Sequence, residues 1–245
     1  MTKWFLFFTL LFALFTSQSY SQENWGGGTD ESPINLGFVF QAISSDYTII
    51  KKSSWREPFS DPLTKQEVKP PLYSIASPAT PGFGLGFVTN VKLSEHFDLR
   101  FSPGYIFADH TLKYEYANPD DAVTRMVPFS IMNLPLGIRV KSDRKRNFRA
   151  YLIAGARYSI DLLSEDKING DASQPLADRS VKNKKGILWY EAGIGFQLYF
   201  DYFKLSPEIK FSHTINSTLR PEDHPYSSPI EKLFIQDIQF SIYLE

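Results

Sequence analysis

The sequence predicts an all-β protein, an eight-stranded antiparallel up-and-down transmembrane β-barrel whose lumen is filled by side chains. First, apolar and polar residues alternate in eight segments of about ten residues, the length of a membrane strand. Second, the connections between these segments alternate between long and short. Third, after the N-terminus no apolar run approaches the ~20 residues that a spanning helix needs.

The N-terminus has the layout of an export signal. Lys3 supplies the positive charge, Trp4 to Phe15 is apolar apart from Thr9, and Ser19-Tyr20-Ser21 precedes the expected cut. We therefore predict a signal peptide over residues 1–21, a flexible periplasmic segment over 22–33 and the barrel over 34–245. An uncleaved membrane anchor is the alternative, although the run is short for spanning.

The strands are expected wherever the alternation is sustained. They are Ile34 onward, Gly82–Leu93, Phe97 to about Tyr114, Phe129–Lys141, Phe148–Asp161, Leu188–Tyr202, Leu205 to about Asn216 and Leu233–Leu244. The connections are Ser44–Pro81, Ser94–His96, Glu115–Pro128, Ser142–Asn147, Leu162–Ile187, Phe203–Lys204 and Ser217–Lys232. Short periplasmic turns and long external loops are typical of outer-membrane barrels, so we expect both termini to lie in the periplasm.

One face of each strand is almost wholly apolar, and the opposite face carries glycines and charges of both signs. In a membrane barrel the apolar face contacts lipid, and eight strands enclose a lumen just wide enough for side chains. The charges expected inside are Arg100, Arg139, Arg157, Glu191, Glu208 and Lys210. A paired structural plug is the first interpretation, because lone buried charges are costly; a proton-linked or partner-coupled switch is the alternative.

Composition and motifs argue against several classes of function. A net charge of −1 disfavours a nucleic-acid partner, and the absence of cysteine excludes a thiolate metal site, a cysteine nucleophile and a lipoprotein anchor. The four histidines form no compact metal motif, so we expect no cofactor, no metal and no small-molecule substrate. His213, near the predicted external rim, leaves a lipid hydrolase open as a minor alternative.

Exposure and length indicate the candidate contact surfaces: the mature N-terminal segment, the loops Ser44–Thr80 and Leu162–Ile187, and a basic turn. Trp25 lies in the predicted N-terminal segment, and Arg144, Lys145 and Arg146 form a basic turn between two strands. Simple solvation is the first interpretation of this turn, and contact with a protein partner or with lipid headgroups is the alternative.

Several motifs resemble one family over nearly all of the mature chain. They are Ser32-Pro33-Ile34-Asn35-Leu36-Gly37-Phe38, Pro81-Gly82-Phe83-Gly84-Leu85-Gly86, Leu99-Arg100-Phe101-Ser102-Pro103-Gly104, Leu134-Pro135-Leu136, Asn147-Phe148-Arg149-Ala150-Tyr151 with Gly155, and Phe203-Lys204-Leu205-Ser206-Pro207-Glu208-Ile209-Lys210-Phe211-Ser212. In their order and spacing they are similar to the PorT/SprT family of the Bacteroidota type IX secretion and gliding machinery. The likeness is weakest in the two long connections.

The resemblance implies a non-catalytic outer-membrane component of protein secretion, and of gliding motility in some members. Its partners would be other membrane or periplasmic proteins of that system, together with outer-membrane lipid. A generic small surface barrel with an adhesive or structural role is the alternative.

Overall fold

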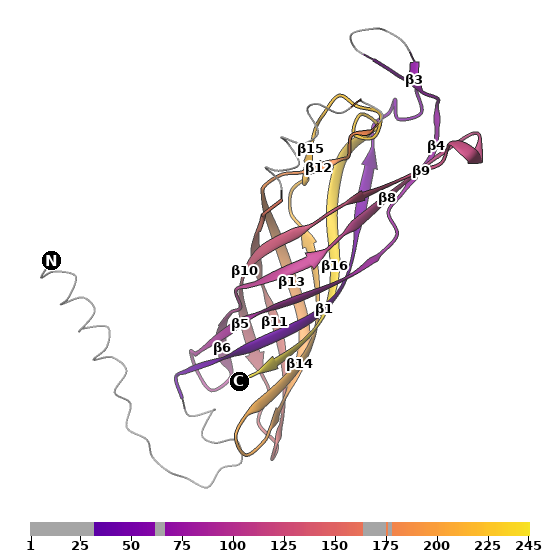
Figure 1. The fold of residues 1–245 in the computed structure, drawn as a ribbon. Helices are drawn as coiled ribbons and strands as arrows, with labels where there is room; N and C mark the ends of the chain where they lie inside the picture. The colour runs from indigo at the N-terminus through magenta and orange to yellow at the C-terminus, as the bar shows by residue number, and fades with distance from the viewer. Residues whose placement is uncertain (1–31, 62–66, 164–174, 176–177) are drawn as a thin grey trace, which may run out of the picture.

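The computed structural model describes residues 32–61, 67–163, 175 and 178–245, and they form a closed antiparallel barrel (Figure 1). The predicted signal peptide and the segment containing Trp25 lie outside these residues. The barrel strands are β1 (Ile34–Lys51), β5 (Thr80–Lys92), β6 (Phe97–Phe101) with β7 (Gly104–Ala108), β10 (Ser130–Lys141), β11 (Phe148–Asp161), β13 (Gly186–Tyr199), β14 (Lys204–Thr214) and β16 (Ile230–Leu244). No helix in the described part of the chain is long and apolar enough to cross a membrane.

Strand pairing closes the barrel with the predicted up-and-down order. Each strand pairs with its neighbours in sequence, and β1 pairs with both β5 and β16, so the ring has no open edge. Strands β6 and β7 share one position in the ring, since both pair with β5 and with β10. The predicted class is confirmed: eight antiparallel strand positions in one ring.

The strand expected from Phe97 to Tyr114 is in fact three strands. It is interrupted at Ser102-Pro103, where proline has no N–H to donate to the ladder. The Pro103 carbonyl still accepts a bond from Phe87 N at 2.9 Å, so the wall stays closed there. The last piece, β8 (His110–Tyr116), leaves the ring and pairs with β4 and β9 instead.

The apolar face points outward over the half of the barrel that carries the described chain ends. Large side chains are exposed there, among them Leu36, Phe38, Phe40, Phe83, Phe87, Leu136, Ile138, Leu152, Ile194, Ile209 and Ile238. The opposite, polar face is buried in the lumen. An apolar outer surface around a polar interior is what a bilayer requires of a barrel.

Strand β1 is longer than expected, because Ser44–Lys51 was predicted to belong to a connection but continues to pair with β16. Along this strand the outward side chains change from apolar to polar. Phe40 and Ala42 are followed by Ser44, Asp46 and Thr48, while the inward positions become Ile43 and Tyr47, both buried. The polarity of the two faces therefore inverts near residue 43, which marks the edge of the apolar band.

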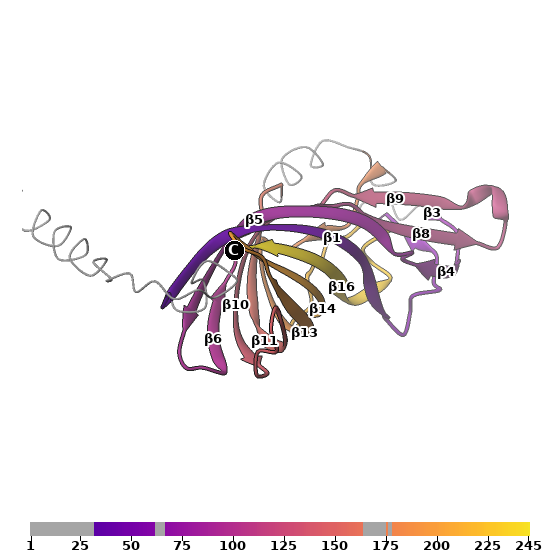
Figure 2. The same cartoon turned by 90° about the horizontal axis from the view of Figure 1, so that it is seen from below.

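Beyond that edge the chain forms an outer extension, a three-stranded sheet of β4 (Leu72–Ala76), β8 and β9 (Val123–Val127). Figures 1 and 2 show this sheet projecting beyond the ring, away from the C-terminus. The short pairs β2 (Phe59–Ser60) with β3 (Glu67–Lys69) and β12 (Lys182–Asn183) with β15 (Leu219–Arg220), and the 3-10 turn η1 (Pro119–Asp121), complete this end.

The inner side of this end is an apolar cluster, which we call the apolar cap. Its fully buried members are Leu112, Tyr114, Trp189, Tyr226, Leu233 and Ile235. Two hydrogen bonds connect polar groups inside it: the Tyr114 hydroxyl donates to the Tyr226 carbonyl at 2.8 Å, and Asn183 Nδ2 donates to the Tyr47 hydroxyl at 2.7 Å. The far end of the barrel thus has a conventional apolar core.

Candidate functional site: the charged lumen

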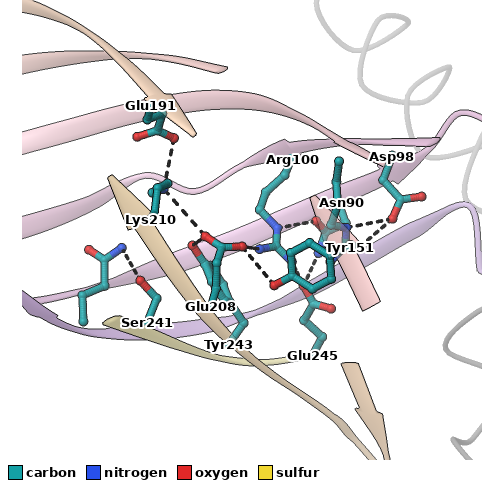
Figure 3. Close-up of polar contacts among 12 residues, drawn as sticks. Asn90, Asp98, Arg100, Tyr151, Glu191, Glu208, Lys210, Ser241, Tyr243 and Glu245 are labelled. Carbon is teal, nitrogen blue, oxygen red and sulfur yellow. Dashed lines mark hydrogen bonds and ion pairs between the residues drawn. The ribbon is translucent and has the colours of Figure 1, made fainter. Parts of the chain in front are cut away.

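Below the apolar cap, the lumen is filled by ionised side chains that project inward from most strands of the ring. The six charges expected from the sequence lie there, each with 3% exposure or less. Strand alternation places them inside, because every second residue of a strand points to the same face. Figure 3 shows the contacts that join four of them, Arg100, Glu191, Glu208 and Lys210.

The centre of the lumen is built around Glu208. Arg100 Nη1 donates to Glu208 Oε2 at 2.8 Å, and the Tyr151 hydroxyl donates to the same oxygen at 2.9 Å. The Tyr243 hydroxyl donates to Glu208 Oε1 at 3.2 Å (Figure 3). Lys210 Nζ lies 3.9 Å from Glu208 and 3.0 Å from Glu191. Four of the expected residues are therefore joined in one chain of contacts.

Glu245, which the sequence analysis did not single out, extends this chain toward the end with the short turns. Its carboxylate contacts Arg100 Nη2 at 3.2 Å and Lys204 Nζ at 2.6 Å, and it accepts a hydrogen bond from Asn90. Arg100 Nε in turn donates to Asn90 Oδ1 at 2.8 Å. Arg100 is thus held by two carboxylates and an amide, with the Tyr243 ring 4.1 Å from its guanidinium carbon.

The remaining two expected arginines use separate carboxylates. Arg139 binds Asp98 Oδ2 through Nε at 3.1 Å and Nη2 at 2.5 Å, and Lys141 contacts the other oxygen of Asp98 at 2.6 Å. Arg157 Nη2 donates to Asp237 Oδ2 at 2.6 Å. Arg157 also lies 4.0 Å from the centroid of the Trp189 ring, so it connects the charged lumen to the apolar cap.

Sequence reasoning did not assign Asp98, Lys141, Asp237 and Glu245 to this network, although all four have the inward parity of their strands. Asp98 meets Arg139 on the neighbouring strand β10. Arg157 on β11, by contrast, reaches Asp237 on β16 across the lumen. The alternation of side chains along each strand would have shown that these residues face the lumen, but not which charged residues they contact.

Among the described residues no group of histidines and carboxylates is arranged to hold a metal ion. His213 faces outward on β14, where its Nδ1 lies 2.7 Å from the Thr214 carbonyl and its ring stacks on Tyr190 and Phe234. In the described part of the chain, no serine hydroxyl or carboxylate lies within hydrogen-bond distance of that ring. The arrangement needed for a hydrolase is not assembled around it.

The basic turn lies at the end of the barrel with the chain terminus. Lys145 and Arg146 are exposed, and Arg144 packs its guanidinium 3.8 Å from the Tyr199 ring centroid. Arg146 has a φ of 54°, which is unusual for a residue other than glycine. The Lys145 and Phe148 backbones exchange two hydrogen bonds that close the turn. Trp25 cannot be placed beside it, since it lies outside the described residues.

Comparison with known proteins agrees with this architecture. Residues 16–220 match the outer membrane protein beta-barrel domain, so the chain belongs to that family and to the outer membrane. Among solved structures it is similar to Neisserial surface protein A (9% identity, 87% of this chain and 99% of that chain, TM-score 0.41) and to OprG from Pseudomonas aeruginosa (11%, 86% and 92%, 0.45). It is also similar to the protease OmpT from Escherichia coli (10%, 94% and 97%, 0.33). The comparison with curated protein sequences gave no match.

Proposed function

We propose that this chain is a non-catalytic outer-membrane component of the type IX protein secretion machinery and acts through protein contacts. The observation that carries the proposal is the filled lumen. A cargo protein cannot cross a barrel whose interior holds interlocked ion pairs under an apolar cap, so its action falls to the surfaces outside the lumen. The resemblance to the PorT/SprT family supports the choice of secretion system.

The outer extension is the first contact surface that we propose. Its sheet has the order β4-β8-β9, so β4 and β9 are its edges within the described residues. Tyr73 and Met126 are 70% and 60% exposed there, which is a large apolar surface for positions outside the bilayer. Edge strands and exposed aromatic residues are features that protein partners use.

The test is a clean deletion of the gene, complemented with the wild-type chain or with a Tyr73→Ala/Met126→Ala variant. We expect the deletion to abolish bulk secretion, and gliding if the strain glides, with unchanged lipid A. The variant should insert normally but restore less secretion and co-purify less of its membrane or periplasmic partner. A matched Glu231→Ala/Lys232→Ala variant, at exposed positions of β16 outside this sheet, is the control. Normal secretion in the deletion strain would overturn the proposal.

A second candidate is a small surface barrel with an adhesive or structural role. The exposed extension favours it as well, because a projecting sheet with large apolar side chains is suited to surface contacts. Its signature is a deletion strain with intact secretion and lipid A but reduced adhesion or weaker envelope integrity. A changed lipid A acyl pattern, reproduced by His213→Ala, would instead indicate the hydrolase.

A further inference from the structure

The outer wall of the barrel has a hollow near the end with the basic turn. It has a volume of about 670 Å³ and lies over β10, β11, β13 and β14, which stand side by side in Figure 2. Outward apolar side chains line most of it, including Val140, Phe148, Ala150, Ile194, Phe196 and Ile209, and the lumen residues Lys141, Tyr151 and Glu208 also contribute to its lining. These residues belong to the apolar band, so the hollow faces the hydrocarbon of the bilayer.

Small or ring-closed residues create this hollow. Ala150 lies between Phe148 and Leu152 on the outward face of β11, which leaves a gap between two large side chains. On the neighbouring strand β14, Pro207 has no N–H to donate to the ladder. Gly195 on β13 faces the lumen, where the Tyr151 ring lies against it. The β13–β14 pairing is interrupted there, between the Gly195–Glu208 and Leu198–Leu205 pairs. The hollow is thus a property of the wall itself and does not depend on a mobile side chain.

The basic turn is continuous with the hollow. Ser142 and Phe148, which line the hollow, stand on either side of the segment that holds Arg144, Lys145 and Arg146. The bond from Arg144 Nε to the Arg146 carbonyl, at 2.7 Å, helps to keep the turn in one shape. An acyl-sized apolar cavity therefore ends beside fixed positive charge.

The neighbouring turn places this end at headgroup level. Phe200, Tyr202 and Phe203 are exposed on the β13–β14 connection, with Tyr202 93% exposed. Aromatic residues gather at the boundary between hydrocarbon and headgroups, and basic residues there attract anionic lipids. The hollow is therefore expected at the depth of the lipid hydrocarbon, and the basic turn at the depth of the lipid phosphates.

We propose that the hollow and the basic turn bind one anionic phospholipid. One acyl chain fills the hollow, and the phosphate contacts Lys145 and Arg146. The site matches the lipid in two ways. Its apolar volume accommodates the acyl chain, and its two exposed cations attract the headgroup. This site goes beyond the proposed secretion role and needs only that the barrel lies in a membrane.

Native mass spectrometry of the full chain released from micelles tests the site, with phosphatidylglycerol and phosphatidylethanolamine of identical acyl chains as probes. We expect wild type to retain one phosphatidylglycerol in preference to phosphatidylethanolamine. Lys145→Gln/Arg146→Asn should reduce that preference by roughly fivefold for each cation removed. Asparagine is chosen because it tolerates the positive φ of Arg146. The charge control is Lys113→Gln/Lys232→Gln, on exposed positions at the other end.

Filling the hollow tests the acyl part separately. Ala150→Phe should lower the retention of both lipids by about tenfold, whereas Ala156→Phe, also outward on β11 but outside the hollow, should leave it unchanged. Circular dichroism checks that each variant is folded. Equal retention of the two lipids by wild type, or equal effects of the two phenylalanines, would overturn the site. Neither result would bear on secretion, which is measured in cells.

Discussion

The two ends of this barrel bury opposite kinds of side chain. In the end that carries the described C-terminus, Arg100, Glu208 and Lys210 are inside and phenylalanines are outside. At the other end Leu112 and Trp189 are inside, while Asp46 and Thr48 point outward. One continuous strand, β1, takes part in both arrangements, so the difference comes from the surrounding solvent and not from the type of secondary structure.

The two ends are therefore held together by different forces. In the apolar band, lipid removes any hydrophobic reason to pack the interior with apolar groups, and ion pairs can fill it instead. At the cap, water surrounds the outer face, so stability comes from burying apolar area inside. Each end should therefore fail under a different kind of substitution.

The largest effect is expected from breaking the centre of the lumen with Glu208→Gln. Arg100 would lose one of its two carboxylates, and Lys210 would keep only Glu191. Breaking a buried ion pair costs about 3–5 kcal/mol, because a desolvated charge is left behind. Urea unfolding in vesicles or micelles measures this loss of stability. The control is Glu231→Gln, because Glu231 is an exposed residue of β16. An unchanged midpoint would show that the network does not stabilise the fold.

A somewhat smaller effect is expected when the cap is hollowed by Leu112→Ala. Leu112 is fully buried, and removing a buried leucine side chain costs about 2–5 kcal/mol, depending on how far the site collapses. The matched change Leu136→Ala removes the same atoms from a lipid-facing position that is 49% exposed. The same unfolding measurement should show a much smaller loss for Leu136→Ala. Equal losses would contradict the division into two regions.

The edge of the apolar band can be located with one charge placed at two heights on β1. Phe40→Arg puts the charge within the band and should destabilise insertion by up to about 2–4 kcal/mol, whereas Thr48→Arg, beyond the edge, should change it by about 0–1 kcal/mol. Both side chains point outward, so the lumen is untouched. Refolding into vesicles at increasing urea measures the difference. Similar values for the two variants would place the edge elsewhere.

Much of this fold follows from side-chain alternation, because a period of two fixes which residues share a face. It predicted the ring of strands and the inward position of residues such as Arg100 and Glu208. It failed on Ser44–Lys51, where the outer face becomes polar and the inner face apolar, so the lipid pattern ends although the strand does not. The break at Pro103 was also missed, since the alternation continues across it.

Partners across the lumen could not be predicted at all. Arg157 meets Asp237, on a strand two places beyond its neighbour, and that contact depends on the radius of the ring. The hollow beside Ala150 also needs several strands in register before it exists. Alternation describes a single strand, whereas these features belong to several strands at once.

The smallest effect concerns the response of the cap to alkaline pH. Burial raises the pKa of Tyr116 to about 12, the neighbouring Tyr226 adds to the rise, and Arg125 opposes it. Burial likewise raises the pKa of Tyr114. A folded-state pKa above the unfolded value of about 10 means that stability is intact below pH 10 and is lost as the pH rises toward 12.

The cap should therefore loosen between about pH 10 and 12, which tyrosinate absorbance and near-ultraviolet circular dichroism can follow. Tyr116→Phe removes one of the buried hydroxyls whose ionisation destabilises the cap, so the midpoint of the alkaline transition should move to slightly higher pH. Tyr73→Phe, exposed on the same extension, is the control and should leave it unchanged. If both variants behave alike, burial of the tyrosine hydroxyls does not determine the pH at which the cap loosens. The contrast between the two ends would then rest on apolar packing alone.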